Sequence, residues 1–144
     1  METYVINKLE ELEQFKTEIG YEVDGNLEVK CDLDFKKSLI VKGSLFIKAG
    51  GFIKAGGSIE AGGFIKAGGS IEAGGSIEAG GSYGISAGLQ ITCKTDLIFG
   101  LKIFAGICTM REITDEEKTI TCVKFKGGKV EYGILKETGE QETK

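Results

Sequence analysis

Cysteine side chains are the first candidates for chemistry in this sequence, because the chain contains no histidine. The four cysteines are Cys31, Cys93, Cys108 and Cys122. No two of them form a CxxC pair, and a chain without histidine forms neither a Cys-His nucleophilic pair nor a His-ligated metal site. We therefore expect free thiols in a reducing cytoplasm, with no catalytic residue, no metal and no cofactor.

Carboxylates and glycine-rich segments are the next candidates. Asp24, Asp32 and Asp34 lie close together in the sequence, but no pocket is implied around them, so solvated strand residues are a better interpretation than a general acid/base pair. The segment "AGGSIEAGG" lacks both the GxxxxGK[ST] motif and the strand–loop–helix context of a phosphate-binding loop. The sequence therefore predicts a protein that is not an enzyme.

Length and charge limit the classes of partner. The chain has 144 residues and a formal net charge of -4, which favours one domain and argues against direct nucleic-acid binding. The start, "METYVINKLEELEQF", lacks the basic and apolar regions of a signal peptide, and no apolar run is long enough to span a membrane. We expect a cytoplasmic protein that does not contact membranes.

A short repeat dominates the middle of the chain, where "IKAGGFIKAGGSIEAGGFIKAGGSIEAGGSIEAG" runs from Ile47 to Gly80. Within each unit, apolar and polar positions alternate, which is typical of a strand, whereas a period of six fits a helix poorly. The aliphatic or aromatic position that recurs every six residues is occupied by Val29, Phe35, Val41, Ile47, Ile53, Ile59, Ile65, Ile71 and Ile77.

Short strands separated by glycines bury one face only if they coil into a solenoid. We therefore predict a mainly β fold, a parallel β-helix of hexapeptide repeats with three strands per coil of eighteen residues. A two-residue insertion around Tyr83 and Gly84 then shifts the next aliphatic to Ile85. In this arrangement Ile47, Ile65 and Ile85 form one internal column.

The two ends of a solenoid need caps, because they expose unpaired strand edges. Residues 1–20 are predicted to form an N-terminal α-helix cap, since Val5, Leu9, Leu12 and Ile19 suggest an apolar helix face over residues 4–19. Residues 21–109 form the predicted solenoid. Residues 110–136 are expected to form a C-terminal β-hairpin that turns at 127–128, and residues 137–144 a tail.

Exposed phenylalanines are the predicted contact residues. Phe46, Phe52 and Phe64 each precede an inward isoleucine and should point outward, with Phe46 and Phe64 on the face that carries Lys48 and Lys66. Two interpretations stay open, a contact surface for a partner or a second copy, and a surface covered by the N-terminal helix. A separate ladder of residues eighteen apart is expected to stack Lys42, Glu60 and Glu78, of which the last two are acidic.

The repeat "IKAGG[FS]IEAGGS" resembles the hexapeptide-repeat solenoids of small phage and prophage proteins, some of which are anti-CRISPR inhibitors. This resemblance covers residues 43–88. The segment "DGNLEVKCDLDFKKSLIVKGSLFIKAGG" is also similar to bactofilins, which are scaffolds whose rods join end to end. The repeats resemble those of hexapeptide acyltransferases too, but the histidine that those enzymes use is absent. Because the first two families differ in coil handedness, the handedness stays open.

Together these observations predict a binding protein. The first hypothesis is an inhibitor that occludes the surface of a protein partner, which the phage resemblance implies to be a CRISPR effector or another defence nuclease. The expected contacts are Phe46, Lys48, Phe52, Phe64 and Lys66, with Glu60 and Glu78 competing if the partner surface normally holds nucleic acid. The second hypothesis is a polymer-forming scaffold. A homodimer or a larger homo-oligomer is compatible with either.

Overall fold

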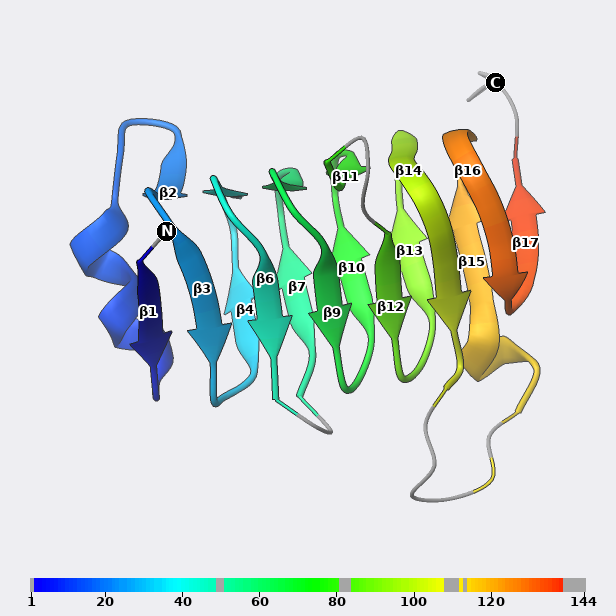
Figure 1. The fold of residues 1–144 in the computed structure, drawn as a ribbon, viewed down its shortest axis with the longest axis horizontal. Helices are drawn as coiled ribbons and strands as arrows, with labels where there is room; N and C mark the ends of the chain where they lie inside the picture. The colour runs from blue at the N-terminus through cyan, green and yellow to red at the C-terminus, as the bar shows by residue number, and fades with distance from the viewer. Residues whose placement is uncertain (1, 49–50, 81–83, 108–111, 113, 139–144) are drawn as a thin grey trace.

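The protein is a parallel β-solenoid of about five turns, mainly β with 55% of its residues in strands. A computed structural model describes residues 2–48, 51–80, 84–107, 112 and 114–138. Its strands stand side by side along the molecule, from the N-terminal end to the C-terminal end (Figure 1). The expected insertion at Tyr83 and most of the expected tail, residues 139–144, lie outside the described residues.

The strands are short in the repeat and longer towards the C-terminus. The first half of the chain contains β1 Thr3–Ile6, the 3-10 helix η1 Leu9–Phe15, β2 Gly20–Val23, β3 Asn26–Val29, β4 Leu33–Phe35, β5 Ser38–Val41, β6 Leu45–Ile47, β7 Ile53–Ala55, β8 Ile59–Ala61, β9 Ile65–Ala67 and β10 Ile71–Ala73. The second half contains β11 Ile77–Glu78, β12 Ile85–Ala87, β13 Ile91–Cys93, β14 Asp96–Ala105, the 3-10 helix η2 Glu116–Lys118, β15 Thr119–Cys122, β16 Lys124–Tyr132 and β17 Ile134–Glu137.

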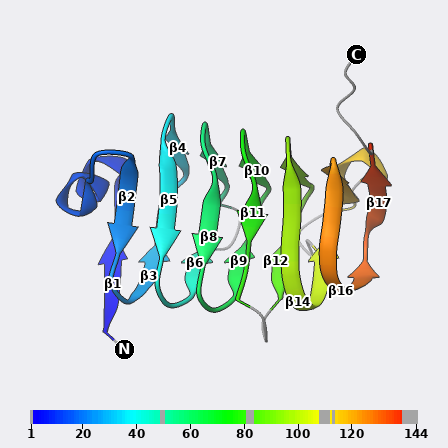
Figure 2. The same ribbon diagram turned by 90° about the horizontal axis from the view of Figure 1, so that it is seen from above.

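Successive turns are joined by parallel backbone pairing, in which β3 pairs with β6, β4 with β7 and β5 with β8. The pairs form a six-stranded sheet in the order β17-β15-β13-β10-β7-β4 and an eleven-stranded sheet. The larger sheet has two arms, β1-β3-β6-β9-β12 and β2-β5-β8-β11, which meet at the long strand β14. Figure 2 shows the second arm as a row that leads to β14 and β16.

Alternation of side chains along each strand builds the core. In β7, Ile53 and Ala55 are buried while Lys54 between them is exposed, and the other repeat strands follow the same pattern. The paired glycines allow the turns to approach one another closely at the corners. At Gly62, for example, a Cβ atom would collide with the carbonyl oxygen of Lys42 in the preceding turn.

The register between turns differs from the expected one at a single place within the repeat. Leu27 opposes Leu45, eighteen positions on, but Leu45 then opposes Ile65, which is twenty positions on. The extra two residues lie between β6 and β7, where the connection covers residues 48–52, whereas the connections from β2 to β6 have two or three residues. Ile47 is buried as predicted, but it opposes Ala67, so the column of Ile47 and Ile65 is wrong, whereas Ile65 does oppose Ile85.

The N-terminal segment is only partly helical. Thr3–Ile6 is a strand that pairs with β3, and only Leu9–Phe15 forms a helix, of the 3-10 type. Of the apolar residues that suggested a longer helix, Leu12 is buried, whereas Val5 and Ile19 are 46% and 70% exposed. Pairing with β3 satisfies the backbone of residues 3–6 without a helix, which explains why the apolar spacing was misleading.

The C-terminal segment is not a hairpin. β15, β16 and β17 all pair in parallel with strands of the solenoid, and β16 runs without reversal through the two glycines at which a turn was expected. Gly127 instead adopts a φ of 129° beside a register irregularity in the β14–β16 pair, where a Cβ atom would collide with the Phe99 carbonyl oxygen. Glycine here permits close approach between strands, which sequence alone does not distinguish from a tight turn.

We predict that the inward column carries the stability of the fold. Replacing Ile71, which is completely buried, by alanine should lower the free energy of unfolding by about 2–5 kcal/mol, because it leaves a cavity between β7 and β13. Urea denaturation followed by circular dichroism measures this change. The matched control Glu72→Ala alters the adjacent outward position and should change stability by less than about 0.5 kcal/mol. Equal losses in the two variants would contradict the assignment of faces.

Candidate protein-binding face

One arm of the larger sheet presents most of the aromatic residues predicted to make contacts. Across β3, β6, β9, β12 and β14, the outward residues that face each other in the ladder are Glu28, Phe46, Lys66, Ser86 and Phe104. All of these strands are joined to their neighbours by backbone hydrogen bonds. A molecule that binds this face therefore meets side chains on a preformed surface.

Phe46 and Lys66 are direct neighbours on this face. The ammonium group of Lys66 lies 5.4 Å from the centre of the Phe46 ring, which is a cation–π contact. Phe64 lies two residues before Lys66, where its backbone N–H donates to the hydroxyl oxygen of Ser44 at 3.1 Å. Phe46 and Phe64 are each 40% exposed, so the N-terminal helix does not cover them.

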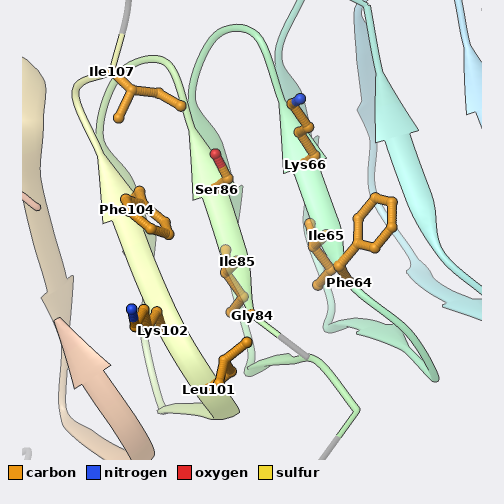
Figure 3. A pocket seen from close by; sticks show the side chains of 10 residues that line it. All are labelled: Phe64, Ile65, Lys66, Gly84, Ile85, Ser86, Leu101, Lys102, Phe104 and Ile107. Atoms are coloured by element: carbon orange, nitrogen blue, oxygen red, sulfur yellow. The ribbon is translucent and has the colours of Figure 1, made fainter. Parts of the chain in front are cut away.

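A groove of about 520 Å³ opens beside Phe64 (Figure 3). Its middle strand, β12, presents Ser86 outward and is preceded by Gly84, while bulkier side chains stand on or beside the flanking strands β9 and β14. Small residues between two rows of large ones leave the hollow. The residues that line it are Phe64, Ile65, Lys66, Gly84, Ile85, Ser86, Leu101, Lys102, Phe104 and Ile107.

A smaller hollow of about 240 Å³ continues the groove towards the N-terminus. It is lined by Thr3, Asn26, Leu27, Glu28, Ser44, Phe46 and Phe64. Phe64 lines both hollows. We call the residues Phe46, Phe64, Lys66, Leu101, Phe104 and Ile107 the aromatic face.

The charged residues that line the larger hollow are positive, whereas Glu28 lines the smaller one. Lys66 and Lys102 are the charged lining residues of the larger hollow, and none of its lining residues is acidic. Lys102 also lies 3.9 Å from a carboxylate oxygen of Glu131, an exposed pair that contributes little to stability. The groove thus combines an apolar surface with two cations that remain accessible to an anionic group.

Two of the predicted contact residues lie apart from this face. Lys48 follows the end of β6 and is exposed, but it does not stack on Lys66, because the register places Phe46 there instead. Phe52 is half-buried before β7, and its N–H donates to a carboxylate oxygen of Asp32 at 3.1 Å. It therefore belongs to the six-stranded sheet, since β7 pairs there with β4 and β10.

The acidic ladder lies on the other arm of the larger sheet. Glu60 and Glu78 face each other across the β8–β11 pair, as the sequence predicted, and both are half-buried. Their neighbours in the ladder are Ile40 and Ile98, so the expected stack of Lys42 on Glu60 is wrong. Two carboxylates without a lysine between them make this strip locally negative.

Sequence reasoning missed much of the groove wall formed by β14. Leu101 is 56% exposed and Ile107 is 39% exposed, and Lys102 stands between Leu101 and the inward Ile103. The segment "DLIFGLKIFA" breaks the six-residue period, and this break could have indicated an unusual strand. β14 continues through Gly100. Its first part pairs with β11 and its second part with β12, so Leu101 lies where the strand passes from one arm of the larger sheet to the other.

The described residues offer little support for other chemistry. Burial raises the pKa of the Cys31 thiol, and the nearby Asp32 carboxylate raises it further, so this thiol is not activated. No group of three cysteine or acidic residues within the described ranges could hold a metal ion. No helix in the described part of the chain is long and apolar enough to cross a membrane.

Comparison with known proteins adds no family. No protein-family model matches the chain, and neither the curated proteins nor the solved structures include a match. The structure supports a repeat β-helix. The resemblances to phage proteins and to bactofilins remain expectations from the sequence.

We predict a measurable coupling between Phe46 and Lys66. A double-mutant cycle with Phe46→Leu and Lys66→Met should give about 0.5–1 kcal/mol in urea denaturation, because the contact is partly exposed. The control cycle combines Lys66→Met with Ser86→Ala. Ser86 faces Lys66 in the ladder from the side opposite Phe46, and this coupling should be near zero. Indistinguishable couplings in the two cycles would show that the Lys66–Phe46 contact is not formed in solution.

Proposed function

We propose that this protein is a non-enzymatic binding module that holds a protein partner on its aromatic face. The observation that supports this most directly is the gathering of exposed apolar side chains on one sheet. Leu101, Phe46, Phe64 and Ile107 are 56%, 40%, 40% and 39% exposed, and the groove joins three of them. Aromatic residues surrounded by a polar rim are typical of protein interfaces.

The rigidity of the sheet favours binding. Strands β6, β9 and β12 have a paired strand on each side, so their backbone is already ordered before a partner arrives. A preorganised face loses little conformational entropy on association. The same pairing leaves no free strand edge in the middle of the face, so the partner binds through side chains rather than by adding a strand.

The partner is expected to carry carboxylates beside apolar residues. Lys66 and Lys102 border an apolar groove that has no acidic lining residue, so an acidic and apolar segment complements it. We extend this proposal to a bacterial defence nuclease, such as a CRISPR effector, which the protein would inhibit by covering its surface. The Glu60–Glu78 strip would then compete with nucleic acid for a basic region of that partner.

We also propose that each turn is built from three hexapeptide units. The repeated pairing of each strand with the third one after it supports this, as do the ladder steps of eighteen or twenty positions. The steps of twenty arise where a turn contains two additional residues. Under this proposal the residues of the aromatic face recur once per turn, which explains how one face collects them.

Charge placed on the aromatic face should abolish partner capture. The double variant Phe46→Asp/Phe64→Asp should lose at least about tenfold in affinity, because it introduces two carboxylates into a face flanked by apolar residues. Pull-down from a bacterial lysate, followed by titration of the purified partner or of a CRISPR effector, measures this loss.

The matched control is Phe52→Asp, which makes the same chemical change on the six-stranded sheet. It should retain binding, and circular dichroism should show all variants folded. Equal binding by the wild type and the double variant would reject the aromatic face. Loss in the Phe52 variant alone would move the binding site to the other sheet.

A second candidate function is a scaffold that joins through the C-terminal end of the solenoid. The inward residues of the last turn, Phe125, Val130 and Leu135, are only partly buried, and Ile134 and Tyr132 are 42% and 47% exposed. Within the described residues, β16 and β17 each pair with a strand on one side only. At the other end, η1 packs on the first strands and inserts Leu12 into the core.

Light scattering at rising protein concentration distinguishes the two functions. The scaffold predicts a mass that increases with concentration, and the variant Ile134→Lys should reduce it, because a charge would be placed beside the exposed strand. The binding module predicts a constant mass of a monomer or dimer in both proteins. Filaments that are unaffected by Phe46→Asp/Phe64→Asp would favour the scaffold.

A further inference from the structure

Two cysteines meet inside the solenoid near its C-terminal end. β13 and β15 are paired so that Ile91 opposes Ile120 and Thr92 opposes Thr121, and the next residues of the two strands are Cys93 and Cys122. Both side chains point into the core, with exposures of 3% and 1%. They are free thiols, and nothing in the proposed binding function uses them.

The two thiols interact with each other. The Sγ atom of Cys93 donates to the carbonyl oxygens of Asp96 at 3.5 Å and of Thr95 at 3.8 Å. The neighbouring thiols also perturb each other, so that the pKa of Cys93 is raised and that of Cys122 is lowered. Burial and the carboxylates of Glu137 and Asp96 act in the opposite direction on the pKa of Cys122. Of the two sulfurs, Cys122 lies nearer the end of the sheet, because its strand β15 stands between β13 and the last strand, β17.

The spacing of the strands suits a covalent bond. Adjacent strands in a sheet lie about 4.7–4.9 Å apart, and the Cα atoms of a disulfide are usually about 4.4–6.8 Å apart. The two cysteines directly follow the paired residues Thr92 and Thr121, and both point inward, so closing the bond requires no change of register. It requires a local approach of the two Cβ atoms, which a disulfide holds about 3.5–4.5 Å apart.

One strand, β17, separates this pair from the end of the six-stranded sheet. β15 is covered on its other side by β17, in which Glu137 opposes Cys122. Glu137 is exposed, and β17 pairs with no further strand among the described residues. Transient opening of an edge strand costs less than global unfolding, so release of β17 would expose Cys122.

We propose that Cys93 and Cys122 form a redox pair that closes into a disulfide between neighbouring turns when the protein meets a small-molecule disulfide oxidant of the glutathione type. The thiolate of Cys122 attacks one sulfur of the oxidant, forming a mixed disulfide and releasing one small thiol. Cys93 then loses its proton, and its sulfur attacks that of Cys122 and releases the second small thiol. The two protein thiols are oxidised by two electrons, and the oxidant is reduced to two thiols.

The bond would tie down the part of the chain that completes the aromatic face. Between the two cysteines lie Leu101, Phe104 and Ile107, which form one wall of the groove. A covalent link across this segment limits its freedom in the unfolded chain and keeps β15 beside β13. The inference does not depend on the proposed function, since it rests on the interior of the solenoid.

The test is a disulfide map of the folded protein. Native protein is treated with oxidised glutathione, free thiols are alkylated in denaturing urea, and trypsin cuts after lysine and arginine. Cys93 then lies in the peptide 67–94, Cys122 in 119–124, Cys31 in 31–36 and Cys108 in 103–111. We expect peptides 67–94 and 119–124 to be recovered as one linked species, and Tm to rise by roughly 5–10 °C.

Two controls make the result specific. In the variant Cys31→Ser/Cys108→Ser, both remaining thiols should disappear together, with no dimer formed. In Cys93→Ala, Cys122 should instead retain the glutathione adduct, because its resolving partner is gone. In protein oxidised in denaturing urea, the preference for the Cys93–Cys122 disulfide should be lost, and other pairs of cysteines should be linked as well. The proposal is overturned if both peptides stay fully alkylated, or if Cys122 of the wild type stops at the glutathione adduct.

Discussion

Parallel backbone pairing between successive turns is the interaction on which this structure depends. It satisfies the backbone of strands only two to four residues long across the repeat, which would not be stable alone. It also places like residues above one another, so isoleucine packs on isoleucine inside while polar and aromatic residues form ladders outside. Glycine at the corners permits this stacking, because a Cβ at a position such as Gly62 would strike the backbone of the preceding turn.

The aromatic face follows from that pairing and from one change of register. The longer connection between β6 and β7 moves the following turn by two positions, which brings Lys66 beside Phe46 rather than beside Lys48. The next strand in the ladder, β12, has a small outward residue, so a groove forms between β9 and β14. Contacts that give the face its shape and charge are thus products of connection length rather than of residue type alone.

Parallel pairing between successive turns also determines the structure of the C-terminal region. Continued parallel pairing, in place of a hairpin, adds a further turn that buries Ile120 and Cys122 and brings Cys122 beside Cys93. The redox chemistry that we infer and the uncovered last turn therefore share one structural origin.

The sequence by itself determined which residues face inward, because alternation along a strand is a local property that a repeat such as "SIEAGG" displays directly. From it follow the solenoid, the buried isoleucines, the exposed Phe46 and Phe64, and the Glu60–Glu78 pair. Only the tertiary structure decided which outward residues become neighbours, how residues 3–6 pair, and that 127–128 is not a turn. Those features depend on how far the chain travels before it returns to the next turn, and a difference of two residues in a connection changes every contact across the ladder without altering the alternation within any strand.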